Sequence, residues 1–154
     1  MNQVFIGIGC NQNHPHFRVQ SAFKQINRIH STRLIKKSSL YETVPLGPKF
    51  QPNFINAVVE IETTLSPNRL LDELQLLEKN HNRKKTKRWG PRSLDLDILI
   101  YEQVIMDTEK LTIPHPGLEY REFVLIPLYE ITTYGYKVPK YGSCLLYTSD
   151  AADE

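Results

Sequence analysis

The order of strand-like and helix-like segments constrains the fold of this chain most strongly. Short apolar runs rich in β-branched residues predict strands, and apolar residues three or four positions apart predict helices. Strands are predicted at residues 4–8, 34–42, 54–63 and 94–101, and helices at residues 17–29 and from Ser66 onward. This β-α-β-β-α-β order predicts an α+β fold of the ferredoxin-like type, in which two helices cover one face of an antiparallel sheet.

Both predicted helices carry an apolar stripe. Ser66 is the predicted N-cap of the second helix, and Pro67 suits the first helical position, where no backbone donor is needed. The stripes consist of Val19, Ala22, Phe23, Ile26 and Ile29 in the first helix and Leu70, Leu71, Leu74 and Leu77 in the second. After Tyr101 we expect a C-terminal extension with a short strand at residues 104–105, a proline-rich loop and a helix around residues 123–129.

The composition is that of one soluble domain. A chain of 154 residues has room for a single core. Its apolar runs are shorter than the roughly 20 residues that a membrane-spanning helix needs. The N-terminus lacks a signal-peptide pattern, so we expect a cytoplasmic protein. Cys10 and Cys144 are too few for a disulfide framework or a zinc site.

The end of the sequence differs in character from the rest. From Gly142 it reads GSCLLYTSDAADE, which contains no cation and resembles translated cloning or adaptor sequence. We therefore expect one domain over residues 1–142 and a non-native or disordered tail over residues 143–154.

Two carboxylates on one predicted strand are the clearest chemical signal. Asp95 and Asp97 stand two positions apart, so both side chains lie on one face, while Leu94, Leu96 and Ile98 point into the core. Like charges this close repel each other unless a cation lies between them. Magnesium prefers one or two carboxylates and completes its shell with phosphate oxygens and water. The pair therefore predicts a magnesium site.

Cations surround this strand in the sequence. Residues 82–88 read NRKKTKR, although the net charge of the chain is only +2, and Arg92 follows Gly90 and Pro91. Carboxylates for metal and arginines for phosphate oxygens are the parts of phosphoryl-transfer sites. Taken alone, however, the acidic pair also fits a solvated strand face, and the basic run fits a solvated segment or a nucleic-acid patch.

Two other functions use similar parts. An RNA-recognition module has the same element order with exposed aromatic residues, but the acidic strand face would repel a phosphate backbone. A nucleotidyltransferase with a two-carboxylate site would release pyrophosphate from ATP, whereas a diphosphate transferase would release AMP.

The segment RWGPRSLDLDIL, residues 88–99, resembles the signature of the 6-hydroxymethyl-7,8-dihydropterin pyrophosphokinase family. Further similar motifs follow in the family's order, namely IGIGCN, YETVPLGP, FINAVV, Glu78 with Arg83, LTIPHP and FVLIPLYEI. Together they cover about residues 4–131. The resemblance implies transfer of diphosphate from ATP to the hydroxymethyl group of the pterin in folate biosynthesis, with AMP as the other product. It also implies a monomer with two Mg²⁺ ions and with no nucleic-acid or membrane partner.

The resemblance assigns roles to individual residues. The implied pterin site comprises Thr43, Val44, Leu46, Phe54, Asn56, Trp89, Asp95 and Phe123, with the ring stacked between the two phenylalanines. The implied ATP site comprises Gln75, Glu78, Lys85, Arg88, Trp89, Arg92, Ile98, Lys110, Thr112, His115 and Arg121. The implied catalytic residues are Arg83, Arg92, Asp95 and Asp97; both aspartates bind metal, and Asp95 is also a candidate proton acceptor. Ordinary core packing is the alternative for Phe54 and Phe123, and a turn residue is the alternative for Asn56 and His115.

The sequence departs from the family pattern at a few positions. Asn82 stands where glycine is usual, and Lys85 keeps the charge of an arginine without its bidentate fork. Cys10, Lys110 and Pro116 also differ from the commoner residues. None of these changes removes an implied metal ligand.

Overall fold

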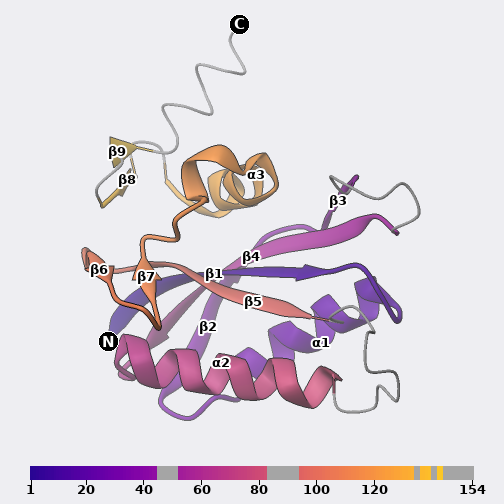
Figure 1. Cartoon of the computed structure of the whole chain (residues 1–154), viewed down its shortest axis with the longest axis horizontal. Helices are drawn as coiled ribbons and strands as arrows, with labels where there is room; N and C mark the ends of the chain where they lie inside the picture. Colours follow the sequence, from indigo (N-terminus) through magenta and orange to yellow (C-terminus); the bar gives the residue numbers. More distant parts are fainter. Residues whose placement is uncertain (45–51, 83–93, 134–135, 140–141, 144–154) are drawn as a thin grey trace, which may run out of the picture.

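A five-stranded antiparallel sheet forms the centre of the molecule, with helices on both faces (Figure 1). The computed structural model describes residues 1–44, 52–82, 94–133, 136–139 and 142–143. The helices are α1 (Pro15–Asn27), α2 (Pro67–Asn82) and α3 (Glu122–Ile131), with a 3-10 turn η1 (Leu118–Tyr120). The strands are β1 (Asn2–Cys10), β2 (Thr32–Lys37), β3 (Tyr41–Thr43), β4 (Phe54–Thr63), β5 (Asp95–Tyr101), β6 (Met106–Asp107), β7 (Thr112–Ile113), β8 (Lys137–Val138) and β9 (Gly142–Ser143).

The strand order is β2-β4-β1-β5, and β3 pairs with β4 on the same edge as β2. With α1 and α2 as the crossover helices, this is the ferredoxin-like arrangement, so the predicted fold class is confirmed. Both helices lie against the same face of the sheet (Figure 1). The predicted stripe on α2 is confirmed, because Leu70, Leu71 and Leu74 are buried and Leu77 packs against the same core.

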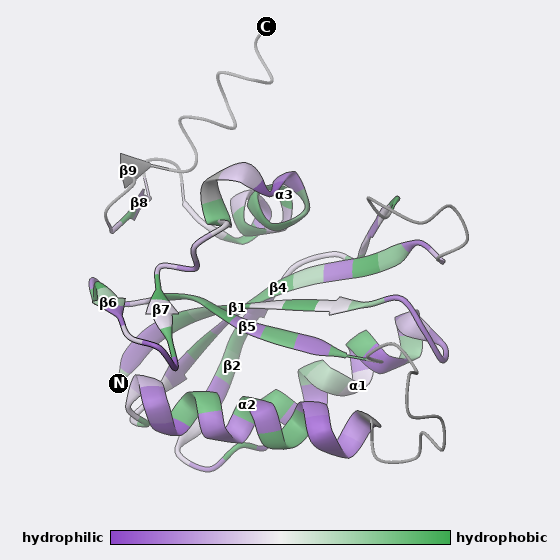
Figure 2. Ribbon diagram, viewed as in Figure 1, coloured by the Kyte–Doolittle hydropathy of each residue, from purple (hydrophilic) through white to green (hydrophobic). Residues whose placement is uncertain are grey.

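Helix α3 covers part of the opposite face. Its residues Val124 and Leu128 form a second core with Phe5 of β1, Val58 of β4 and Leu99 of β5. This packing explains why residues 55–59 of β4 are all buried instead of alternating. Figure 2 shows hydrophobic and hydrophilic residues mixed along the strands and along α2.

Three local predictions need correction or refinement. The strand predicted at 34–42 is two strands, because Ser38 uses both its N–H and its hydroxyl on Val58 and the chain bends before β3. The strand predicted at 104–105 is wrong: the paired residues are Met106 and Asp107 of β6. The predicted strand at 94–101 begins one residue later, at Asp95.

The predicted start of α2 is confirmed. The Ser66 hydroxyl accepts a hydrogen bond from the Arg69 N–H at 3.3 Å, as an N-cap does. In the described part of the chain, no helix combines the length and the apolar character needed to cross a membrane. Of the predicted tail, Ser143 pairs with Lys137, and residues 144–154 lie outside the described residues.

The α2 stripe offers a matched test of core packing. Leu74 is fully buried, whereas Leu76 on the same helix is 52% exposed. We expect Leu74→Ala to lower the free energy of unfolding by about 2–5 kcal/mol, because it removes buried surface and leaves a cavity. Leu76→Ala should change it by less than about 0.5 kcal/mol. Urea denaturation of both variants measures the difference, and equal losses would contradict this account of the core.

Candidate active site

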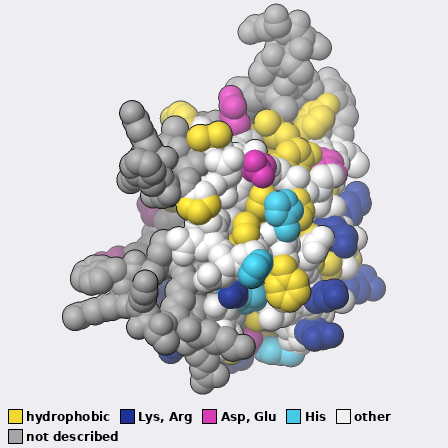
Figure 3. Space-filling model, turned by 90° about the vertical axis from the view of Figure 1, so that its right-hand side faces the viewer, with side chains coloured by type: hydrophobic (Ala, Val, Ile, Leu, Met, Phe, Trp, Pro, Cys, Tyr) yellow, Lys and Arg dark blue, Asp and Glu magenta, His cyan; other side chains and the backbone are white. Residues whose placement is uncertain are grey.

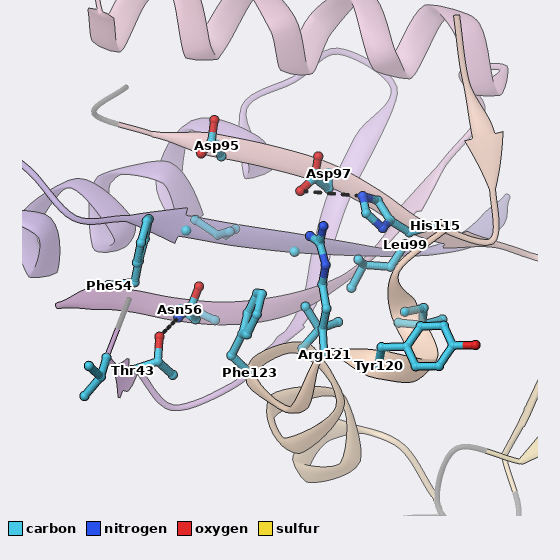
Figure 4. A pocket seen from close by; sticks show the side chains of 17 residues that line it. Thr43, Phe54, Asn56, Asp95, Asp97, Leu99, His115, Tyr120, Arg121 and Phe123 are labelled. Atoms are coloured by element: carbon cyan, nitrogen blue, oxygen red, sulfur yellow. Dashed lines mark hydrogen bonds and ion pairs between the residues drawn. The ribbon is translucent and has the colours of Figure 1, made fainter. Parts of the chain in front are cut away.

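A cavity of about 460 Å³ lies on the sheet face that α3 covers only in part. Its walls come from β1, β3, β4, β5, the segment before α3 and α3 itself (Figure 4). This volume is in the usual range for a small-molecule site. The residues that line it include Gly7, Gly9, Thr43, Val44, Phe54, Asn56, Asp95, Asp97, Leu99, His115, Leu118, Tyr120, Arg121, Phe123 and Val124.

Two glycines of the central strand form the floor of this cavity. Gly7 and Gly9 alternate with Ile6 and Ile8, whose side chains face α1 and α2, so the glycines face the cavity. Because the two glycines lack side chains, they leave open space above β1 between the side chains of β4 and β5. Our sequence reasoning assigned no role to these glycines. The signal was the repeated glycine in IGIG, at positions that share one face of a strand.

Asn56 is a fixed polar group beside this floor. Its side chain is buried, and its amide nitrogen donates to the Thr43 hydroxyl oxygen at 2.8 Å. Figure 4 shows the amide oxygen on the side away from Thr43. A Cβ atom on Gly9 would lie only 3.1 Å from this oxygen, so the glycine leaves the amide the space that it occupies. Asn56 can therefore present a preset hydrogen-bonding edge to a ligand.

Two phenylalanine rings flank Asn56 (Figure 4). Phe54 begins β4 and pairs with Thr43 of β3, whereas Phe123 is the second residue of α3. The guanidinium of Arg121 lies 5.8 Å from the centre of the Phe123 ring, a distance at which a cation is attracted to an aromatic face. The side chains of Phe54 and Phe123 are only partly buried. They are thus available to a flat ring, although ordinary core packing was the alternative.

Asp95 and Asp97 extend from β5 over the same floor. Asp95 pairs with Gly9, and Asp97 pairs with Gly7. As predicted, the neighbouring residues Leu96 and Ile98 are buried on the other face, and Leu94 is buried as well. The Asp97 side chain is 50% exposed. The cavity therefore contains two carboxylates that a solvent-borne cation can reach.

His115 follows β7 and lies beside Asp97 (Figure 4). Its Nε2 is 3.9 Å from Asp97 Oδ2, and its Nδ1 accepts a hydrogen bond from the Gly117 N–H at 3.2 Å. Burial lowers the pKa of His115, Arg121 acts in the same direction, and Asp97 opposes both. The ring is therefore neutral at pH 7, and the Gly117 contact leaves the hydrogen on Nε2. His115 offers a hydrogen-bond donor toward Asp97 and the cavity; it is not one half of a strong ion pair.

The cavity brings together most of the predicted residues that the structure describes. These are Thr43, Val44, Phe54, Asn56, Asp95, Asp97, His115, Arg121 and Phe123. Leu46, Arg83, Lys85, Arg88, Trp89 and Arg92 lie outside the described residues.

Five residues predicted for ATP do not line this cavity, namely Gln75, Glu78, Ile98, Lys110 and Thr112. Gln75 is exposed on α2. Glu78 accepts a hydrogen bond from the Leu96 N–H at 2.8 Å, which ties α2 to the edge of β5. The Ile98 side chain is buried in the core beneath α1 and α2, so only its main chain can reach a ligand above the sheet.

Lys110 lies just before β7, and Thr112 is the first residue of that strand. Lys110 pairs with Asp72 at 3.0 Å, and the Thr112 hydroxyl donates to Asp107 at 3.3 Å. Neither residue lines the cavity, so their predicted role in nucleotide binding stays a prediction. The view in Figure 3 shows cationic side chains gathered along one side of the molecule.

Comparison with known proteins identifies the relationship. The family model described as 7,8-dihydro-6-hydroxymethylpterin-pyrophosphokinase (HPPK) matches residues 5–133. The chain belongs to this family. The HPPK assignment agrees with the resemblance that the segment at residues 88–99 and its companion motifs indicated.

Named relatives agree with the HPPK family. The 2-amino-4-hydroxy-6-hydroxymethyldihydropteridine pyrophosphokinase of Haemophilus influenzae is 47% identical over 133 residues, which cover 86% of this chain and 83% of the relative. The enzyme of the same name from Pseudomonas aeruginosa is 40% identical over 131 residues, which cover 85% of this chain and 81% of the relative.

Solved structures support the fold. A crystal structure described as HPPK-DHPS in complex with substrates has a TM-score of 0.73 and 14% identity, covering 99% of this chain and 44% of that one. A Plasmodium falciparum HPPK-DHPS structure has a TM-score of 0.75 and 14% identity, covering 99% of this chain and 46% of that one. The chain thus spans less than half the length of these structures. At this identity the likeness shows the fold alone.

The floor of the cavity gives a test that needs no ligand. We expect Gly9→Ala to lower the free energy of unfolding by about 1–3 kcal/mol, because the new methyl group crowds the buried Asn56 amide. The side-chain amide resonances of Asn56 in an NMR spectrum should shift as its bond to Thr43 is disturbed. Gly7→Ala is the matched control: its methyl group would meet the flexible Leu99 side chain at 3.3 Å, so Asn56 should keep its resonances. Identical spectra for the two variants would contradict this account of the floor.

Proposed function

We propose that this chain transfers a diphosphate group from ATP to the hydroxymethyl oxygen of 6-hydroxymethyl-7,8-dihydropterin and releases AMP. The observation that carries the proposal is one cavity in which two aromatic rings flank a fixed amide and two carboxylates lie across β1, on β5. The two parts suit the two substrates, because a flat heterocycle needs rings and a polar edge, whereas a polyphosphate needs bound cations. Membership of the HPPK family supports the same reaction.

The pterin fits between Phe54 and Phe123. Stacking on both faces buries a flat ring without requiring a polar partner for each ring atom. Asn56 then binds the polar edge of the ring, with its orientation already fixed by Thr43. Val44, which is exposed at the end of β3, offers main-chain groups beside Thr43. A preset edge of this kind discriminates between heterocycles by their donors and acceptors.

Asp95 and Asp97 have the chemistry of a magnesium site. Both supply hard oxygen ligands from one face of β5, and both line the cavity. In the part of the chain that the structure describes, no third His, Cys, Asp or Glu completes a protein-only metal cluster. Phosphate oxygens and water would therefore supply the remaining ligands of the two Mg²⁺ ions that we propose here. When bound, these ions neutralise phosphate charge and lower the pKa of the attacking hydroxyl group.

The residues on the other side of the cavity suit the triphosphate. The Nε2–H of the neutral His115 can donate to a phosphate oxygen, and the Arg121 guanidinium offers several N–H donors to phosphate oxygens. Arg83 and Arg92 are proposed to stabilise the bridging and leaving oxygens, with Lys85 and Arg88 as further phosphate contacts.

In the reaction, the hydroxymethyl oxygen forms a bond to the β-phosphorus of ATP. The bond between this phosphorus and the oxygen that bridges to the α-phosphorus breaks, and AMP leaves with the electron pair. The hydroxyl proton passes to solvent or to Asp95. The protein's main contribution is alignment, because stacking and the Asn56 contact hold the pterin while charged groups hold the polyphosphate.

Product analysis tests the proposed function. The chain is incubated with ATP, Mg²⁺ and the pterin alcohol, and products are separated by chromatography and identified by mass. AMP and the pterin diphosphate are the expected products. Release of pyrophosphate would indicate nucleotidyl transfer instead, and no pterin-dependent loss of ATP would refute the proposal.

The carboxylate pair gives the first site prediction. We expect Asp97→Ala to reduce the transfer rate by about 100-fold or more, because a phosphate-bound cation loses a ligand. The melting temperature should not fall, since the substitution removes a half-exposed charge beside another carboxylate. Rates and melting curves of Asp97→Ala and of the similarly shaped Asp97→Asn check both parts. Near-normal turnover in both variants would refute the metal assignment.

The aromatic slot between Phe54 and Phe123 gives the second site prediction. Phe123→Ala should raise the dissociation constant of the pterin by about tenfold or more, because one stacking surface disappears. The dissociation constant of an ATP analogue should change by less than about twofold. Phe17→Ala, at a 69% exposed position on α1, is the matched control. Calorimetric titration measures all three proteins, and equal losses for both ligands would count against the slot.

A further inference from the structure

The carboxylate of Glu130, near the C-terminal end of α3, receives hydrogen bonds from three donors. The Ser39 N–H lies 2.9 and 3.1 Å from its two oxygens, and the Ser39 hydroxyl lies 2.9 Å from Oε2. The Tyr41 hydroxyl donates to Oε1 at 2.6 Å. One side chain of α3 thus binds the segment that leads into β3. None of these residues lines the cavity.

The chain bend before β3 explains why these donors are available. Ser38 bonds to Val58 of β4 through both its N–H and its hydroxyl. At Ser39 the ladder between β2 and β4 has ended, and β3 starts only at Tyr41. The Ser39 N–H therefore takes its acceptor from outside the sheet, at an exposed position. Glu130 supplies it.

This contact connects two walls of the cavity. Phe123 and Glu130 are seven residues apart, so they lie on one side of α3 about 10.5 Å apart along its axis. Tyr41 and Thr43 are two residues apart, so they share one face of β3. One end of each element carries a residue of the aromatic and amide site, and the other end carries a partner in the Glu130 contact.

The protonation states suit this contact near neutral pH. The hydrogen bond to Glu130, together with burial and the carboxylate charge, raises the pKa of Tyr41 to about 12. Burial alone would raise the pKa of Glu130, but the bonds from Tyr41 and Ser39 outweigh it and the pKa is lowered. Glu130 is therefore an anionic acceptor and Tyr41 a neutral donor, and charge-assisted bonds of this kind are strong and directional.

We propose that Glu130 is a positioning residue for the pterin: by holding the Ser39–Tyr41 segment against α3, it sets the distance between Phe123 and the Thr43–Asn56 pair. The inference rests on the proposed function, because it concerns the pterin end of the same cavity. The inference predicts different effects on the binding of the two substrates. The Glu130 contact joins α3 to the Ser39–Tyr41 segment, whereas Asp95 and Asp97 stand on β5 and take no part in that contact.

The test compares Michaelis constants for the two substrates in the full chain. Glu130→Ala should raise the pterin KM by about fivefold or more, while the ATP KM and kcat change by less than about twofold. Glu130→Gln, which keeps an acceptor oxygen, should recover most of the loss. Tyr41→Phe, which removes one of the donors, should cause a smaller increase.

Glu62→Ala is the matched control. Glu62 is also a carboxylate on the β2–β4 side of the sheet, and it pairs with Arg33 at 2.8 Å, but neither residue lines the cavity. This variant should leave both KM values unchanged. Melting curves of every variant show whether the fold persists at the assay temperature. If Glu130→Ala is not folded at the assay temperature, the KM values of Tyr41→Phe and Glu130→Gln are compared with those of the wild-type chain instead.

The outcomes separate the two hypotheses. If the wild-type chain forms AMP and the Glu130 variants show an unchanged pterin KM, or equal increases for ATP and pterin, the positioning role is wrong and the proposed function stands. If the wild-type chain neither binds nor converts the pterin, the proposed function and the positioning role are both wrong. A selective rise in the pterin KM that Glu130→Gln largely reverses supports the positioning role.

Discussion

The structure depends on the two-sided burial of the central strand β1. Ile6 and Ile8 pack under α1 and α2, and this contact fixes the sheet against the helices. On the other face, Phe5 packs under α3, but Gly7 and Gly9 contribute no side chains to fill the space that follows. One strand therefore changes along its length from a core element to the floor of a cavity. A larger residue at either glycine would meet Leu99 or Asn56.

The cavity separates two kinds of chemistry across this floor. On one side, β4 and α3 supply aromatic rings and a buried amide. On the other, β5 supplies two carboxylates, with His115 and Arg121 nearby. Antiparallel pairing fixes the position of the two carboxylates, because Asp97 and Asp95 stand directly beside Gly7 and Gly9. A flat heterocycle and a cation-bound polyphosphate can thus lie next to each other, each with its own set of contacts.

Helix α3 closes the arrangement although it is not part of the ferredoxin-like core. It buries Val58 and Leu99, brings Phe123 to the cavity and contacts the Ser39–Tyr41 segment through Glu130. A single helix therefore stabilises the second face of the sheet and shapes one wall of the site. This double role is possible because the first turn of α3 brings Phe123 to the cavity, while Leu128 and Ile131 further along the helix pack against the sheet.

The sequence by itself determined the core and the chemistry of β5. Local periodicity is a property of neighbouring residues, so the strands at 4–8 and 54–63, the stripe on α2 and the shared face of Asp95 and Asp97 were correctly predicted. The same local patterns gave too long a strand at 34–42, because its interruption depends on Ser38 bonding to Val58, 20 residues away. Only the tertiary structure decided that Gly7 and Gly9 form a floor, that Thr43 fixes Asn56, and that Glu130 reaches Ser39. These contacts join residues that are far apart in the chain, and no local pattern encodes such a distance.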